Sequence, residues 1–184
     1  ARAAAGHLLA LGHRSFLVIG VEPPLPAGRQ DPEGVMNRRL RGYRAALGDA
    51  GIDLSDEAIV VGPASISGGA AAFARAWEDG LRPTAVLAMS DAMAIGAMRA
   101  IREHRLAVPG DVSVVGFDDL DLAQFTNPTL TTVHQPVRRK GEEAVRLLLS
   151  LIERRPPERP EHRRLETRLV IRASAGPALA SNGR

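Results

Sequence analysis

Polar side chains that could bind a ligand follow three apolar runs of the sequence. Ser90 comes directly after one run and Asp118 after another, while Arg39 lies beyond the loop that follows a third. A carboxylate accepts hydrogen bonds from hydroxyl groups, and a guanidinium donates them in a rigid fork. We therefore expect these residues to bind a small ligand that carries several hydroxyl groups.

Each of these residues also has a purely structural alternative. Ser90 or Asp91 could do no more than cap the helix that follows, and Arg39 could be a surface arginine. The acids within 118–121 could form a turn with a helix cap. They could also bind a metal ion, but a hard cation needs more oxygen ligands and a loop turned by glycine, which this segment lacks. The sequence therefore predicts no metal site.

The common signatures of enzymes are missing. The sequence has no Gly-x-Ser-x-Gly elbow, no phosphate loop and no His-Glu-x-x-His motif. The segment 62–69 is rich in glycine, but its spacing matches neither a dinucleotide-binding nor a phosphate-binding loop. His134 stands at the end of a predicted strand, where a structural role is the simpler interpretation. These observations favour a binding protein without a cofactor over an enzyme.

The composition is that of a folded protein without disulfides. Of the 184 residues, 45% are apolar and 24% are charged, which argues against disorder and allows one domain with a substantial core. No apolar run is long enough to span a bilayer. The absence of cysteine excludes thiolate metal sites and suits a cytoplasmic protein. Basic residues gather between 137 and 172, but acids are interleaved with them and only 3% of the chain is aromatic, so a solvated helix face is favoured over a nucleic-acid surface.

Extended and helical patterns alternate along the chain. Short continuous apolar runs are typical of strands buried on both faces, and the segments between them have helical periodicity. The alternation predicts an α/β fold with a parallel sheet flanked by helices, in which ligands bind beyond the carboxyl ends of the strands. The predicted strands are 15–21, 58–61, 85–89, 112–117, 130–133 and 165–171. The predicted helices are 3–11, 38–50, 67–79, 92–104 and 137–154, with a helical turn at 120–125 and a loop at 22–34.

Several motifs occur in a specific order. They are Ala10-Leu-Gly-His-Arg14, Arg39-Leu-Arg-Gly-Tyr43, Met89-Ser-Asp91, Val108-Pro-Gly-Asp-Val-Ser-Val-Val-Gly-Phe-Asp-Asp119 and Pro128-Thr-Leu-Thr-Thr-Val-His-Gln-Pro136. Together they resemble the effector-binding domain of LacI/GalR-type transcriptional regulators, and the resemblance covers about residues 1 to 172.

The resemblance implies a type I periplasmic-binding-protein-like fold of two lobes with an effector between them. Residues 1–134 would form the C-terminal lobe, 135–163 would cross to an N-terminal lobe absent from this chain, 164–172 would return and 173–184 would form a tail. The chain lacks an initiating Met, a secretory signal and a DNA-binding domain, so we expect it to be a fragment. The implied partners are a small-molecule effector (commonly a sugar), operator DNA through the absent N-terminal domain, and a second copy in a homodimer, without a membrane. The implied mechanism is a population shift in which the effector changes operator affinity.

The resemblance also assigns roles to individual residues. The implied effector contacts are Arg39, Ser90, Asp118 and Gln135. The implied dimer surface comprises Met93, Ala97, Leu122 and Phe125. The helix 137–154 carries more apolar surface than a free helix should expose, and in the family the matching helix packs on the N-terminal lobe.

Three alternatives remain at this point. A periplasmic sugar-binding protein shares the fold and would have a signal peptide in place of a DNA-binding domain. A truncated lobe could act alone as a ligand-binding or dimerisation module. An enzyme on a doubly wound sheet is the third possibility, and only turnover would support it.

Overall fold

The structure is a computed structural model, and it describes residues 1–21, 34–153 and 163–179. The strands are β1 (Phe16–Val21), β2 (Ile59–Gly62), β3 (Ala85–Ala88), β4 (Ser113–Val115), β5 (Thr132–His134) and β6 (Arg168–Val170). The helices are α1 (Arg2–Ala10), α2 (Val35–Asp49), α3 (Ile66–Glu78), α4 (Asp91–Glu103) and α5 (Val137–Ile152), with short 3₁₀ turns η1 (Asp56–Ala58) and η2 (Asp121–Gln124).

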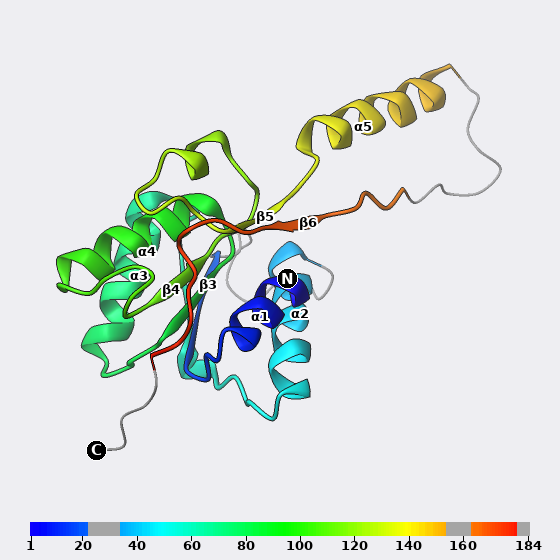
Figure 1. Cartoon of the computed structure of the whole chain (residues 1–184). Coiled ribbons are helices and arrows are strands. Elements are labelled where there is room, and N and C mark those ends of the chain that lie inside the picture. Colours follow the sequence, from blue (N-terminus) through cyan, green and yellow to red (C-terminus); the bar gives the residue numbers. More distant parts are fainter. Residues whose placement is uncertain (22–33, 154–162, 180–184) are drawn as a thin grey trace.

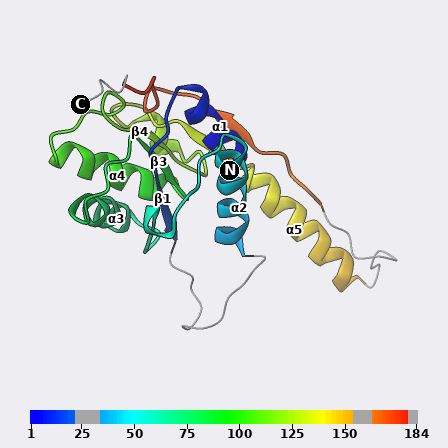
Figure 2. The same cartoon turned by 90° about the horizontal axis from the view of Figure 1, so that it is seen from below.

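A four-stranded parallel sheet in the order β2-β1-β3-β4 forms the centre of the molecule. Helices α1 and α2 cover one face and α3 and α4 cover the other (Figures 1 and 2). This three-layer arrangement confirms the predicted α/β fold. It also brings the carboxyl ends of β1, β3 and β4 to the same edge of the sheet, as parallel pairing requires.

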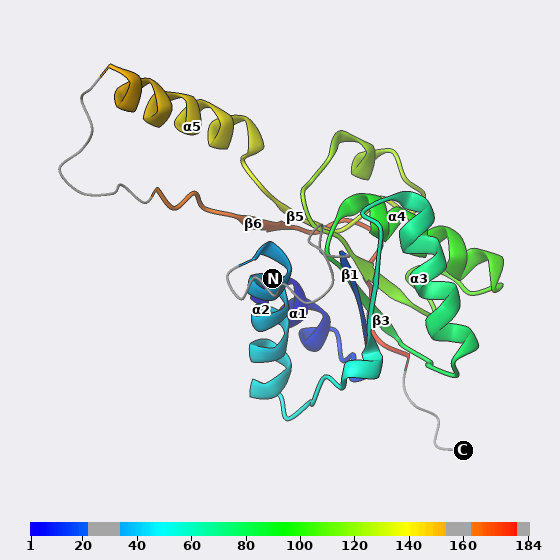
Figure 3. The same cartoon turned by 180° about the vertical axis from the view of Figure 1, so that it is seen from behind.

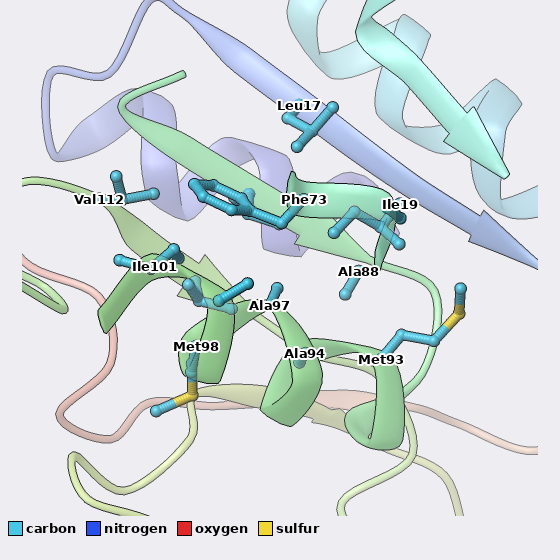
Figure 4. Close-up of a cluster of buried hydrophobic side chains, with 14 of the residues drawn as sticks. Leu17, Ile19, Phe73, Ala88, Met93, Ala94, Ala97, Met98, Ile101 and Val112 are labelled. Carbon is cyan, nitrogen blue, oxygen red and sulfur yellow. The ribbon is translucent and has the colours of Figure 1, made fainter. Parts of the chain in front are cut away.

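The apolar runs form strands because both of their faces are covered. All four residues of β3 are buried, and alternate residues of β1 enter two different cores. Leu17 and Ile19 point toward α3 and α4, where they lie near Phe73 and Ile101 (Figure 4). The neighbouring Val18 belongs instead to the core beneath α1 and α2. The alternation is that of a strand buried on both sides.

Helices α3 and α4 pack closely because two glycines face the opposite backbone. A Cβ on Gly69 would lie 2.1 Å from the Met93 carbonyl oxygen, and a Cβ on Gly96 would lie 1.9 Å from the Ile66 carbonyl oxygen. No side chain fits at either position. The contact holds α4 firmly against α3 and therefore fixes the helix that follows Ser90.

Beyond β4 the chain continues the sheet with less regular pairing. The amide of Gly116 donates to the Thr131 carbonyl over 2.9 Å, and the amide of Asp118 donates to the Val133 carbonyl over 3.0 Å. The last residues of the predicted strand 112–117 thus pair with the segment that contains β5 and not with β3. For this reason β4 is shorter than predicted. The predicted loop 22–34 lies almost entirely outside the described residues.

Strands β5 and β6 form an antiparallel ribbon that leads to and from α5. Val133 pairs with Leu169, and α5 extends away from the sheet beyond the ribbon (Figures 1 and 3). None of the residues of α5 is buried, and Leu148 and Ile152 are more than half exposed. The predicted apolar helix is therefore present, and its apolar side chains are uncovered in the described part of the chain.

Residues 173–179, which the sequence analysis assigns to a tail, join the edge of the sheet. Ser174 is fully buried; its hydroxyl donates to the Val114 carbonyl over 2.6 Å and accepts from the Thr131 amide over 2.8 Å. Further along, the Gly176 carbonyl oxygen lies 3.0 Å from Nε2 of the buried His13. The segment thus holds β4, β5 and the loop before β1 together at the end opposite the predicted site.

Candidate functional site

Arg39 lies on α2 and extends to the carboxyl ends of β3 and β4. Its guanidinium stacks on the Phe117 ring, 3.7 Å from the ring centre, and donates to the Met89 carbonyl. One of its nitrogens is 3.6 Å from Asp118 Oδ1. The side chain is only 14% exposed, so burial lowers the pKa of the guanidinium while Asp118 opposes that shift. Arg39 is therefore an oriented, partly buried cation and not a surface arginine.

Asp118 faces Arg39 from the end of β4. Its Oδ1 accepts a hydrogen bond from Gln135 Nε2 over 2.6 Å, and the side chain is three-quarters buried. Burial raises the pKa of this carboxyl group, while Arg39 and Gln135 favour its charged form. The structure thus brings together three of the four predicted ligand residues, and they come from α2, the end of β4 and the segment after β5.

Ser90 has the structural role that the sequence analysis left open. It is the N-cap of α4, and its side-chain oxygen accepts from the Met93 amide over 3.2 Å. This satisfies one of the unpaired amides in the first turn. Ser90 follows Met89, whose carbonyl accepts from Arg39, so the cap lies beside the cluster, but its hydroxyl is bound to the Met93 amide and not to Arg39 or Asp118.

Asp91 is not the cap of α4 but a buried anchor for the loop after β4. Its Oδ1 accepts from the Thr132 hydroxyl over 2.5 Å, and its Oδ2 accepts from the Leu120 amide over 2.7 Å. Burial raises the pKa of Asp91, and these two hydrogen bonds oppose the shift. Gly116 leaves room for the carboxylate, because a Cβ there would lie 2.4 Å from Asp91 Oδ1.

Asp119 points away from Arg39, toward the β5–β6 ribbon. Its Oδ1 accepts from Arg172 over 2.6 Å, and its Oδ2 lies 2.9 Å from His134 Nδ1. Burial opposes ionisation of Asp119, but the hydrogen bonds and charges of Arg172 and His134 outweigh it and hold the pKa below its usual value. The sequence analysis missed Arg172, which stands 53 positions from Asp119, and no local spacing signal links the two.

The acids at 118–121 lead into a turn, as one alternative predicted, but they do not cap it. The turn η2 begins at Asp121 after Leu120, and no side chain caps it. Among residues 1–21, 34–153 and 163–179, no group of three or more His, Cys, Asp or Glu side chains could hold a metal ion. Asp118 and Asp119 instead bind opposite partners, because adjacent residues at the end of the sheet direct their side chains to different sides.

The expected dimer surface needs a correction. Met93 and Ala97 are fully buried in the core between α4, α3 and the sheet, so they have no surface to offer a partner. The close packing of α3 on α4 covers that face of α4. Leu122 and Phe125 are exposed, Phe125 by 80%, and they belong to or follow η2. A nearby surface pocket of about 260 Å³ is lined by Ile95, Met98, Arg102, Thr126 and Asn127.

No helix in the described ranges combines the length and the apolar character needed to cross a membrane.

The comparisons with known proteins agree on one family. Residues 5–175 match the family model described as a periplasmic binding protein-like domain. The chain is 40% identical over 137 residues to the ribose operon repressor of Escherichia coli K12, a match that covers 74% of this chain and 41% of the relative. It is 39% identical over 147 residues to the transcriptional regulator MalR of Clostridium butyricum, covering 80% of this chain and 43% of the relative. The chain thus spans less than half the length of these relatives.

Solved structures give the same result. A complex of the transcriptional regulator CelR with cellobiose superposes with a TM-score of 0.84 at 34% identity, covering 95% of this chain and 50% of the other. A LacI-family regulator from Enterococcus faecium with bound ribose superposes with a TM-score of 0.78 at 28% identity, covering 97% of this chain and 62% of the other.

Proposed function

Because this chain belongs to the periplasmic binding protein-like domain family of LacI-type transcriptional regulators, we propose that it binds a small-molecule effector, a sugar, on behalf of such a regulator. In the proposed mechanism the effector changes the affinity of the regulator for operator DNA, which a separate N-terminal domain contacts. The protein acts in the cytoplasm, as a binding protein and not as an enzyme.

The observation that carries this proposal is the cluster of Arg39, Asp118 and Gln135. At the carboxyl ends of the strands, the Asp118 carboxylate forms an ion pair with the Arg39 guanidinium and accepts a hydrogen bond from the Gln135 amide. A carboxylate has about four lone-pair positions, so Asp118 can accept from ligand hydroxyls in addition to Gln135. The buried Phe117 ring beneath Arg39 keeps the guanidinium in place. This mixture of polar groups suits a sugar, which presents hydroxyl groups around a ring.

The division of the chain into lobes is part of the same proposal. Residues 1–134 form one lobe, 135–163 cross to a second lobe outside this chain, and 164–172 return. The uncovered apolar side chains of α5 support this arrangement, because a helix that contacts only water would not gain from carrying them. The effector would then bind between the lobes and favour one lobe arrangement over another.

The first test measures sugar binding by titration calorimetry in the natural protein that contains this chain. D-ribose and cellobiose are the first probes, and operator release is followed in parallel. Arg39→Ala and Asp118→Ala should abolish detectable binding, whereas Arg44→Ala should not, since Arg44 forms an exposed ion pair with Asp56. Unchanged binding in the first two variants would remove both residues from the site.

We also propose that Leu122 and Phe125 contribute to a homodimer surface. Large apolar side chains at this exposure are typical of contact surfaces, and the pocket beside them offers a concave counterpart. Sedimentation should show a shift toward monomer in Phe125→Ser. The matched control is Leu179→Ser, because Leu179 is similarly exposed, at 67%, but lies outside this region. An equal sedimentation coefficient for the two variants would argue against the assignment.

A further inference from the structure

Asp119, His134 and Arg172 form a cluster behind the proposed effector site, and we call it the Asp119 clamp. The side chains of Asp119 and Arg172 are 14% and 15% exposed. Oδ1 of Asp119 contacts Arg172, and Oδ2 contacts His134. Charged hydrogen bonds of this length in a mostly buried setting are strong and directional. Both carboxylate oxygens of Asp119 thus have side-chain partners.

The clamp joins the end of β4 to both strands of the ribbon. His134 is the last residue of β5, and Arg172 follows β6. Arg172 is itself fixed: its second guanidinium nitrogen donates to the Leu130 carbonyl over 2.8 Å, and its amide donates to the Thr131 hydroxyl over 2.9 Å. Asp119 therefore holds the strand that enters α5 and the strand that returns from it.

The backbone at the clamp has an unusual conformation. Asp118 has φ of 128° and Asp119 has φ of 61°, and non-glycine residues rarely adopt such positive values. A conformation of this kind persists only when surrounding contacts impose it. On one side Asp91 holds the Leu120 amide, and on the other side Arg172 holds the Asp119 carboxylate.

We infer that Asp119 is a positioning residue: through Arg172 and His134 it fixes Asp118 beside Arg39, and it couples the Asp118 carboxylate to β5 and β6. The coupling part of this inference rests on the proposed function. A ligand that binds Asp118 and shifts its backbone also shifts the adjacent Asp119, whose carboxylate binds Arg172 and His134. The free energy of ligand binding is therefore coupled to the orientation of the ribbon. Because the ribbon connects to α5, the link extends toward the part of the chain that crosses between lobes.

The first experiment needs no effector and uses the natural protein that contains this chain. Amide hydrogen exchange is compared between the wild type, Asp119→Ala and Arg172→Gln, with Asp121→Ala as the control from the same loop. We expect amide exchange at Asp118 and Gln135 to accelerate roughly tenfold or more in the two clamp variants, because these amides pair across the clamped loop. Exchange in β1 and β3 should not change. Unaltered protection at Asp118 and Gln135 would overturn the inference.

Asp119→Asn keeps the experiment decisive if Asp119→Ala does not fold. Asparagine tolerates positive φ and retains an oxygen that accepts from Arg172, but it loses the charge. We expect exchange rates between those of the wild type and Arg172→Gln. A variant with wild-type rates throughout would show that the charged contact does not hold the loop.

The second experiment titrates D-ribose and cellobiose into the natural protein that contains this chain. Asp119→Ala and Arg172→Gln should each weaken binding on the order of tenfold. The double variant should bind no more weakly than either single variant, because the two changes remove one shared interaction. Additive losses, or wild-type affinity in both single variants, would overturn the positioning role while the proposed function stands. If the wild type itself binds none of the sugars, the proposed function fails, and hydrogen exchange decides whether the clamp holds Asp118.

Discussion

Asp118→Asn should separate effector binding from stability. In the structure the Asp118 carboxylate is three-quarters buried, lies 3.6 Å from Arg39 and accepts from Gln135 over 2.6 Å. Asparagine has nearly the same shape, tolerates the positive φ of this position and keeps an oxygen for Gln135. The substitution therefore removes the charge and leaves most of the local geometry intact.

The expected magnitudes follow from these contacts. Burial disfavours the carboxylate, which is why its pKa is raised, so losing the charge removes an unfavourable desolvation along with the attraction to Arg39. We expect the free energy of unfolding to change by less than about 1 kcal/mol. A hydrogen bond to a charged acceptor contributes about 1.5–3 kcal/mol, whereas one to a neutral acceptor contributes about 0.5–1.5 kcal/mol, so the substitution costs about 1–1.5 kcal/mol for each sugar hydroxyl that Asp118 binds. For one such hydroxyl the effector Kd should therefore rise roughly 5- to 15-fold.

Calorimetric titration and urea denaturation of the same samples provide the measurement, with Asp121→Asn as the control. Asp121 is an exposed carboxylate three residues away, so its substitution should alter neither quantity. The reasoning would be refuted by a variant that loses several kcal/mol of stability, which would make Asp118 a structural residue. A variant that binds the effector as tightly as the wild type would refute it as well.

Four further predictions concern the fold, and urea denaturation tests each of them. Gly96→Ala should lower the free energy of unfolding by about 3 kcal/mol, because its Cβ would meet the Ile66 carbonyl. Gly48→Ala should raise it by about 0.5–1 kcal/mol, since nothing lies within 4 Å of that helical position; a similar effect at both sites would contradict the packing argument. Burial lowers the pKa of His13, so the neutral ring stabilises the fold. Its contribution to the free energy of unfolding should be fully present above about pH 6.5 and should be lost as the pH falls through the folded-state pKa. A His13→Gln variant should show a weaker dependence of the free energy of unfolding on pH. Tyr43→Phe should leave stability unchanged or raise it by about 1 kcal/mol, because the hydroxyl is buried without a hydrogen-bond partner among the described residues; a clear loss would show that it has one.

Local patterns in the sequence were sufficient to predict most of the elements. The run around Leu17 to Ile19 and the run 85–88 consist of apolar residues because each strand meets a core on both faces. The capping position of Ser90 was also among the local predictions, since a cap depends on the residues within one helical turn. Element ends were less predictable, as β4 shows, because pairing with a distant strand decides where a strand stops.

The sequence by itself determined the alternation of strands and helices, and with it the edge of the sheet where Arg39, Asp118 and Gln135 meet. Only the tertiary structure decided what the adjacent acids do. In the sequence Asp91 and Asp119 both had the simple interpretation of turn or cap residues. In the structure Asp91, on α4, anchors the loop after β4, whereas Asp119 binds Arg172, which is 53 positions away in the chain. The same holds for Met93 and Ala97, which the packing of α3 buries. The physical reason is that periodicity and capping depend on near neighbours in the chain, whereas burial and ion pairing depend on segments that meet only after folding.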